Sequence, residues 1–222
     1  MRRVTLILAE YATFGTMSIN IILIISIGVV SYFCFSNRDL YTKLLFSPYT
    51  IIREKQWFRF ITAAWVHADF MHLAFNLYVL WGFGNFLESV FVAWFGAIGL
   101  GYYLFLFLGS VIIAGIPSFI KHKDNPRYAA IGASGGVSGV LFANILLQPF
   151  SNLYLFGAVP IPGIVFGVLY LGYSHYMSKK GTDNIGHDAH IWGALGGMAI
   201  IILIKPAVFS NFISEVVSVL PF

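Results

Sequence analysis

The chain has 222 residues, of which 59% are hydrophobic and only 10% are charged, whereas soluble domains carry about 25% charged residues. So few ionic side chains cannot cover a surface that faces water, which excludes an ordinary soluble domain. The formal net charge is +4 and no basic run exceeds two residues, which excludes a nucleic-acid-binding protein. A single cysteine, Cys34, excludes an intramolecular disulfide. The composition predicts an all-α, polytopic protein of the lipid bilayer.

The apolar stretches predict six transmembrane helices, because a bilayer core of about 30 Å requires about 20 apolar residues per crossing. A long stretch without Lys or Arg follows residue 72, and we divide it near Glu88 into two crossings. Pro160 and Pro162 are expected to open the fifth helix. The expected spans are about 17–35, 70–88, 95–117, 132–147, 160–177 and 190–205. We expect an N-terminal segment (1–16), one membrane domain (17–208) and a C-terminal tail (209–222).

A long first loop, residues 36–66, mixes basic and apolar or aromatic residues, which predicts a loop that lies in the membrane interface. The tail has apolar residues at helical spacing, and we expect it to lie along the membrane surface. Ten of the 13 Lys and Arg residues fall in the three loops on one side of the predicted membrane domain. By the positive-inside rule, this count predicts an N-terminus outside the cell. The ten are Arg38, Lys43, Arg53, Lys55, Arg59, Lys121, Lys123, Arg127, Lys179 and Lys180.

A few polar side chains fall at predicted membrane depth, where each needs a partner or a function. His72 and Asn76 are four residues apart and share one helical face. Ser134 lies among glycines, and His190 lies beside a stripe of small residues on the last span. If these small faces dock, His190 can take the proton of the Ser134 hydroxyl, which is the minimum for acyl transfer. His72 and Asn76 would then supply donors for the developing oxyanion.

Simpler interpretations of these residues stay open. Small-residue stripes in membrane helices usually serve only helix packing, and His72 and Asn76 could form interhelical hydrogen bonds. The histidines could also bind a metal ion, but the HExxH spacing is absent, and a separation of five residues turns His67 and His72 away from a common helical face. We predict neither a metal nor an organic cofactor.

Several separate motifs resemble the rhomboid family of intramembrane serine proteases, in the family's order. Residues 67–76 (HADFMHLAFN) resemble its HxxxxHxxxN helix, and residues 132–135 (GASG) resemble its GxSG. Residues 189–197 (AHIWGALGG) resemble its AHxxGxxxG helix. Phe58-Arg59 resembles the Trp-Arg of the first loop, with Trp57 one place early, and Glu88 resembles the acidic residue that follows the second span.

The resemblance implies a six-helix rhomboid fold with Ser134 as the nucleophile and His190 as the base, without an aspartate. His72, Asn76 and the backbone N–H of Ser134 would form the oxyanion hole. The substrates would be membrane proteins, cleaved in or near their transmembrane segments through an acyl-enzyme. The supporting positions are Arg59, His67, Glu88, Gly132, Gly135, Gly193 and Gly197. The family's bacterial members keep the N-terminus in the cytoplasm, so the resemblance implies a bacterial inner-membrane protein whose site opens to the non-cytoplasmic side, against the charge count.

The sequence departs from the family pattern at Ser138, where many members carry an aromatic residue that stacks on the base. Trp192 or a neighbouring tyrosine could substitute. Residues 136–139 (GVSG) also fit GxSG, but we assign the nucleophile to Ser134 because Gly139 then falls where the family has its next glycine. The alternative functions are an inactive rhomboid-like protein that binds transmembrane clients, or a small transporter. The sequence specifies neither the substrate nor the oligomeric state.

Overall fold

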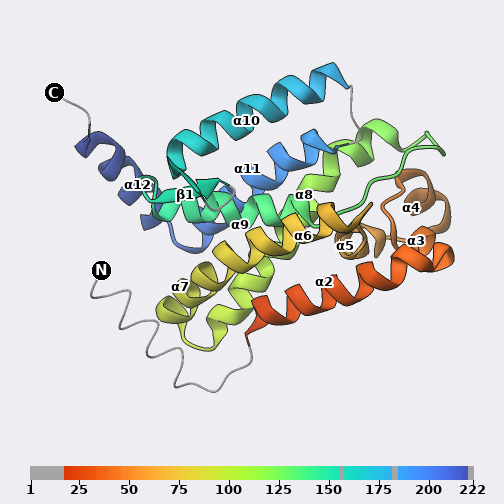
Figure 1. Ribbon diagram of the computed structural model, residues 1–222, viewed down its shortest axis with the longest axis horizontal. Helices are drawn as coiled ribbons and strands as arrows, with labels where there is room; N and C mark the ends of the chain where they lie inside the picture. Colours follow the sequence, from red (N-terminus) through yellow and green to blue (C-terminus); the bar gives the residue numbers. More distant parts are fainter. Residues whose placement is uncertain (1–17, 156–157, 182–184, 220–222) are drawn as a thin grey trace.

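The computed structural model describes residues 18–155, 158–181 and 185–219, and it is mostly helical (Figure 1). The expected N-terminal segment, 1–16, lies outside the described residues. The longer helices are α2 (Ile19–Ser36), α6 (Phe70–Val79), α7 (Asn85–Phe95), α8 (Ile98–His122), α9 (Ser134–Leu147), α10 (Gly163–Lys180), α11 (His187–Ile204) and α12 (Ala207–Ser218). A π-helical turn, Leu80–Gly84, joins α6 to α7. The first loop holds α3 (Arg38–Leu44), α4 (Pro48–Glu54), α5 (Arg59–Thr62) and a 3₁₀ turn (Ala63–Trp65).

Four of the described helical segments are long and apolar enough to cross a membrane. They are Ile19–Ser36, Phe70–Phe95, Ile98–His122 and His187–Ile204. The protein is therefore an integral membrane protein, as the composition predicts. The predicted count of six is not reached by this measure, because α9 has only 14 residues and α10, although 18 residues long, is not apolar enough.

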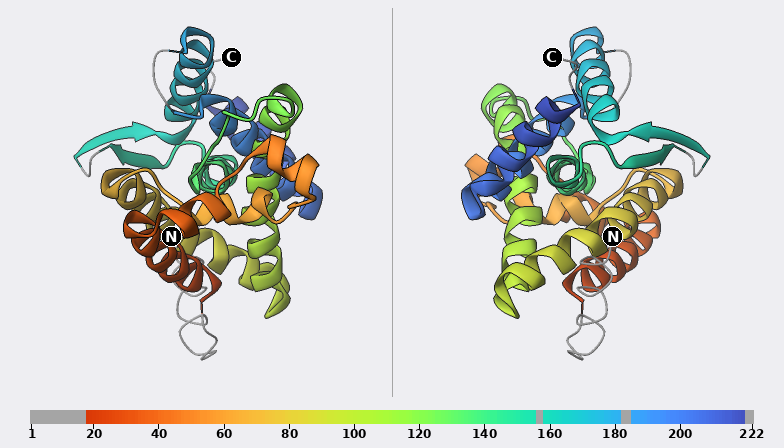
Figure 2. Two further views of the ribbon diagram at one scale, coloured as in Figure 1. Left: turned by 90° about the vertical axis from the view of Figure 1, so that its right-hand side faces the viewer. Right: turned by 90° about the vertical axis from the view of Figure 1, so that its left-hand side faces the viewer.

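Helix α9 lies at the centre of the molecule, with the other helices arranged around it (Figure 2). Every residue from Gly135 to Leu146 is buried. A helix that is apolar or small on all faces has no side to present to water, so it becomes the core of the bundle. The residue that begins this central helix, Ser134, is thereby fixed to the most constrained element of the fold.

Helices α9 and α11 approach each other at backbone distance. A Cβ atom added at Gly193 would overlap the carbonyl oxygen of Gly135, and one added at Gly197 would overlap the backbone of Gly139. The repeated spacing of four residues places these glycines on one stripe of each helix. The docking of the two small faces that the sequence predicts is therefore present in the structure.

The predicted break near Glu88 is wrong, because the helix that begins at Phe70 continues to Phe95. The chain turns only at Gly96, whose φ of 62° is a conformation that favours glycine. Glu88 itself is 1% exposed and accepts hydrogen bonds from the Ser18 hydroxyl (2.5 Å) and the backbone N–H of Ile19 (2.6 Å). Its carboxylate thus caps the N-terminus of α2, where a negative charge is favourable.

The prediction of an all-α fold is wrong for one short segment. Strands β1 (Asn152–Leu155) and β2 (Val159–Pro162) pair as an antiparallel hairpin, with Tyr154 opposite Pro160. Pro160 and Pro162 therefore belong to a strand, where proline is tolerated at an unpaired edge, and the helix begins after them at Gly163. The sixth expected span corresponds to α11, which begins at His187, three residues before the expected start.

The two ends of the bundle differ in what caps them. The hairpin and α12 lie at one end, and the short helices of the first loop gather at the other (Figure 1). Phe46, Trp57 and Phe60 of the first loop form a cluster of aromatic rings with Phe119 of α8, with neighbouring centroids 5.0–6.3 Å apart. Helix α12 contains most of the predicted tail but starts at Ala207 rather than 209; its Val208 is buried, whereas Phe209 and Ile213 are exposed.

Candidate active site

The segment before Ser134 is shaped by a glycine and covered by a histidine ring. Gly132 has a φ of 111°, a conformation that side chains rarely adopt. A Cβ atom at this position would lie 2.8 Å from Cε1 and 2.9 Å from Nε2 of His72. The imidazole of His72 therefore lies directly against the backbone that leads into α9. The space for this ring depends on the absence of a side chain at residue 132.

His67 holds the same segment from the other side. Its Nε2 accepts a hydrogen bond from the backbone N–H of Ala133 (3.3 Å), and its Nδ1 lies 2.8 Å from the Ser31 hydroxyl. Ser31 donates its own proton to the carbonyl of Trp65 (2.8 Å), so Nδ1 of His67 must carry the hydrogen. Burial, with a smaller contribution from His72, lowers the pKa of His67 to about 3. The ring is neutral at physiological pH and acts as a fixed acceptor.

Asn76 lies one turn after His72 on α6 and is buried. Its amide donates one hydrogen bond to the carbonyl of His72, at 2.8 Å. The side chain is therefore restrained to its own helix on the face that carries His72. An amide nitrogen bears a second N–H, which is the group that an oxyanion role requires.

His190 lies between two rings at the start of α11. The ring of Tyr170, on α10, stacks on it with centroids 5.8 Å apart and an interplanar angle of 22°. The ring of His187 meets it edge-on, with centroids 5.7 Å apart and an angle of 76°. The carbonyl oxygen of Ala189 lies 3.7 Å from the position of a Cβ at Gly135. The residues adjacent to His190 and to Ser134 are thus in contact across the α9–α11 interface.

The first loop is tied to this region by Arg59 and by one β-bridge. The guanidinium of Arg59 is buried and donates to the carbonyls of Thr42 (2.9 Å) and Leu45 (2.8 Å). Burial lowers the pKa of Arg59, while the Glu54 carboxylate opposes that shift. Phe46 exchanges two backbone hydrogen bonds with Ala130, at 2.9 and 3.0 Å. Arg59 therefore fixes a loop that is itself joined to the chain four residues before Ser134.

The argument that spacing separates His67 from His72 is wrong, because α6 begins only at Phe70 and His67 precedes it. The two rings meet edge-on with centroids 4.8 Å apart. Among the residues that the structure describes, no group of three or more His, Cys, Asp or Glu side chains is close enough to hold a metal ion.

Sequence reasoning missed Ser31, and for the ring beside His190 it named Trp192 or a neighbouring tyrosine without specifying Tyr170, which is the ring that stacks there. Ser31 is a buried polar residue within an apolar span, and that incongruity was a usable signal. Tyr170 is one of 12 tyrosines in the chain, and no local pattern separates it from the others.

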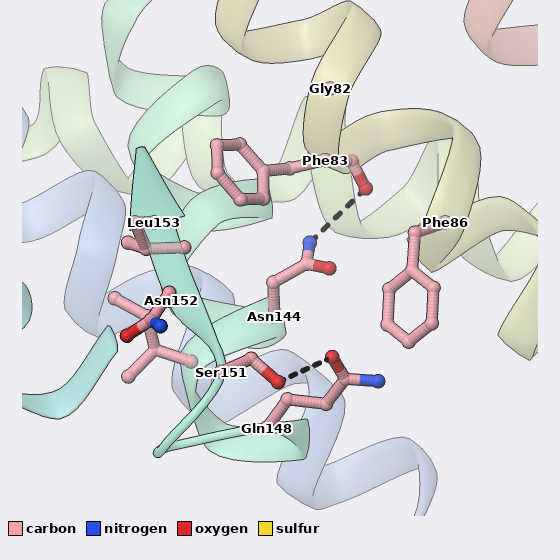
Figure 3. A pocket seen from close by; sticks show the side chains of 9 residues that line it. Gly82, Phe83, Phe86, Asn144, Gln148, Ser151, Asn152 and Leu153 are labelled. Atoms are coloured by element: carbon pink, nitrogen blue, oxygen red, sulfur yellow. Dashed lines mark hydrogen bonds between the residues drawn. The ribbon is translucent and has the colours of Figure 1, made fainter. Parts of the chain in front are cut away.

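A cavity of about 170 Å³ lies at the opposite end of α9, beside the hairpin (Figure 3). There the Asn144 amide donates to the carbonyl of Phe83 (3.2 Å), in the π-helical turn, and Ser151 donates to the Gln148 side chain (3.0 Å). Because Ser134 begins α9 and Asn144 is near its end, this cavity is separate from the candidate active site.

Residues 54–207, well over half of the chain, match the family model described as the rhomboid domain. The chain belongs to the rhomboid family. The rhomboid match begins within the first loop and ends at the start of α12, so it includes Ser134, His190, His72 and Asn76.

Curated rhomboid relatives are similar at moderate identity. RHOMBOID-like protein 12, mitochondrial, from Arabidopsis thaliana is 29% identical over 60% of this chain and 42% of its own length. Rhomboid protease GluP from Bacillus subtilis is 31% identical over 67% of this chain and 26% of its own. Rhomboid-like protein 11, chloroplastic, from Arabidopsis thaliana is 27% identical over 67% of this chain and 53% of its own. The chain thus spans about half or less of these relatives.

Proposed function

We propose that this chain is an intramembrane serine protease that hydrolyses peptide bonds in or near the transmembrane segments of membrane-protein substrates. The observation that carries the proposal is the close α9–α11 contact, in which Gly135, the residue after Ser134, lies against Gly193, three residues after His190. Membership of the rhomboid family supports it, as does the name of a relative, Rhomboid protease GluP. A rhomboid-like protein that only binds clients has no need of both a serine and a histidine at this contact.

In the proposed mechanism, the imidazole of His190 takes the proton of Ser134 as its Oγ bonds to the scissile carbonyl carbon. The tetrahedral intermediate collapses, the C–N bond breaks, and the leaving amine takes the proton from His190. Water then loses a proton to His190 as it attacks the acyl ester. The second tetrahedral intermediate collapses, the bond between the acyl carbon and Ser134 Oγ breaks, and His190 returns the proton to that oxygen, which releases the carboxyl product and regenerates both residues. No redox change and no cofactor are involved.

The oxyanion of each tetrahedral intermediate needs donors that are already in place. The backbone N–H of Ser134 is available in principle, because the first four N–H groups of a helix have no partner within that helix. His72 lies against Gly132, and Asn76 lies one turn further along the same face. We assign the oxyanion hole to these three groups. Gly132 contributes by leaving room for His72, and His67 by fixing the N–H of Ala133.

The proposed fold in the membrane has six spans, with α9 and α10 joining the four longer helices. We propose that the site opens at the end of the bundle that holds the first loop, on the non-cytoplasmic side of a bacterial inner membrane. Water would enter there, since Ser134 and His190 both lie in the first turn of their helices. Substrates would need a locally unwound segment, because a helix keeps its carbonyls in internal hydrogen bonds.

The first experiment is cleavage of a generic single-span substrate by the purified chain in lipid vesicles, beside Ser134→Ala. We expect cleavage by the wild type and none by the variant. Ser89→Ala is the control, because Ser89 is a helical serine of α7 that donates to the carbonyl of Phe86 and is not part of the proposed site. Tight substrate binding without cleavage by the wild type would favour the client-binding alternative. Cleavage by Ser134→Ala equal to that of the wild type would contradict the proposal.

The orientation has its own test. In a Cys34→Ser background, Asp124→Cys places a unique thiol in the loop between α8 and α9. We expect a membrane-impermeant maleimide to label this cysteine in intact bacterial cells. Labelling only after the cells are broken would show that the positive-inside count is right and that the site faces the cytoplasm.

A further inference from the structure

Tyr170 reaches from α10 to the space between α9 and the imidazole of His190. Its hydroxyl lies 2.7 Å from the Oγ of Ser138, one helical turn after Ser134. Its ring stacks on that of His190, at 5.8 Å between centroids and 22° between planes. One side chain thus contacts both helices of the proposed dyad while belonging to neither.

The ring of Tyr170 is itself held in place by two other rings. Phe166, one turn earlier on α10, stacks with it at 5.8 Å and 26°, and Phe142 of α9 packs against it at 5.6 Å and 50°. Gly167 of α10 also faces this part of α9, since a Cβ there would lie at an ordinary contact distance of 3.4 Å from the Phe142 ring. With its hydroxyl bonded and its ring packed, Tyr170 has little freedom to rotate. It therefore presents a rigid aromatic face to His190.

We propose that Tyr170 is the positioning residue of the His190 base. The proposal rests on the proposed function, because it assigns Tyr170 a part in the same reaction. A ring stacked on an imidazole restricts its rotation about the Cβ–Cγ bond. It also stabilises the imidazolium that forms when His190 takes the Ser134 proton, because the face of an aromatic ring attracts a cation. The hydrogen bond between the Tyr170 hydroxyl and Ser138 fixes the position of the ring along α9.

The arrangement also explains the small residue at position 138. A large side chain there would occupy the space that the Tyr170 hydroxyl now fills. Ser138 is buried and provides a hydrogen-bond partner for that hydroxyl, which a buried phenol requires. Serine at 138 and tyrosine at 170 thus form a matched pair, in which the aromatic face comes from α10.

The test compares Tyr170→Leu and Tyr170→Met, which remove the aromatic face, with Tyr170→Phe, which removes only the hydroxyl. The control is Tyr176→Leu, an exposed tyrosine on the same helix. We expect kcat to fall about 3- to 30-fold in the Leu and Met variants, the range of a cation–π contact. KM should change little, and Tyr170→Phe should stay within about threefold of the wild type.

The pH profile separates positioning from simple packing. Loss of the ring destabilises the imidazolium, so the acid limb of the kcat profile should move to lower pH in Tyr170→Leu and Tyr170→Met but not in Tyr170→Phe or Tyr176→Leu. A rescue variant, Ser138→Tyr combined with Tyr170→Ala, returns an aromatic ring from α9. We expect it to be more active than Tyr170→Ala alone.

The outcomes distinguish this inference from the proposed function. If the wild type does not cleave substrate, the proposed function fails. If the wild type cleaves and Ser134→Ala does not, but Tyr170→Leu and Tyr170→Met keep the wild-type kcat and pH profile, only the role of Tyr170 is overturned. If both variants fail to fold, a rescue variant no more active than Tyr170→Ala overturns it as well.

Discussion

Helices α11 and α10 both approach the central helix α9 beside the candidate site, but by different means. Helix α11 does so with its backbone, because Gly193 and Gly197 leave no room for a side chain against Gly135 and Gly139. Helix α10 does so, at the level of Ser138, through the long side chain of Tyr170. A backbone contact requires a small residue wherever the two helices touch, so small residues recur at a regular spacing in the sequence. A contact made by one long side chain produces no such repeat.

The largest expected effect comes from blocking the backbone contact. Gly193→Leu puts a branched side chain where even a Cβ overlaps Gly135, so α11 must move away from α9. We expect loss of substrate cleavage and a marked fall in thermal stability in detergent, because overpacking of a core costs about 1–3 kcal/mol or more.

Gly172→Leu is the matched control, since nothing lies within 4 Å of a Cβ at that helical position. It should retain activity and melt close to the wild type. A Gly193→Leu protein as stable and as active as Gly172→Leu would contradict the account of the α9–α11 contact.

A smaller effect on activity, with the fold retained, is expected from a side chain on α6. His72→Ala removes the ring that lies against Gly132 and, with it, one proposed oxyanion donor. Loss of a single donor lowers the rate by about 10²–10³-fold, so kcat for substrate cleavage should fall by that order. KM and the melting temperature are the accompanying measurements. An unchanged kcat would limit His72 to a packing role.

Glu88 provides a second side-chain contact for the comparison, between α7 and the start of α2. Glu88→Gln keeps the shape of the side chain but removes the negative charge that accepts bonds from Ser18 and Ile19. Hydrogen bonds to a charged group contribute about 1.5–3 kcal/mol, so the free energy of unfolding should fall by about that amount. Glu215→Gln, at an exposed position on α12, is the control. Equal unfolding curves for both variants would show that the carboxylate does not stabilise α2.

The smallest expected effect is a pH dependence that belongs to His67. Its pKa is about 3 in the folded chain, below the ordinary 6.5, so the unfolded chain takes up a proton first as the pH falls. Stability should therefore decline between about pH 6.5 and 3, by at most about 1.4 kcal/mol per pH unit from this group.

His67→Gln lacks this titration, so its stability should change less with pH over the same range. His175→Gln, at an exposed histidine of α10, should keep the wild-type slope. If the pH dependence of His67→Gln matched that of His175→Gln, burial of a neutral His67 would not be its source.

The difference between contacts made by the backbone and contacts made by one long side chain also determines what could be predicted from sequence. The membrane class follows from composition, and the docking of α9 on α11 follows from glycines spaced by four. The end of the helix at Phe95 was missed because Gly96, one of three glycines within six residues of an apolar run, is a weak signal against the charge of Glu88. The hairpin was missed because Pro160 also fits the first turn of a helix. Tyr170 was not specified because its contacts join three helices through one side chain.

The most direct test of the central claim is to locate the adduct of a fluorophosphonate probe by mass spectrometry. The probe reacts only with an activated serine, forming an O–P bond and releasing fluoride. The account predicts one adduct, on the peptide that contains Ser134 and at that residue, in the wild type, and no adduct in His190→Ala. An adduct at Ser138, or equal labelling of the wild type and His190→Ala, would contradict the Ser134–His190 dyad.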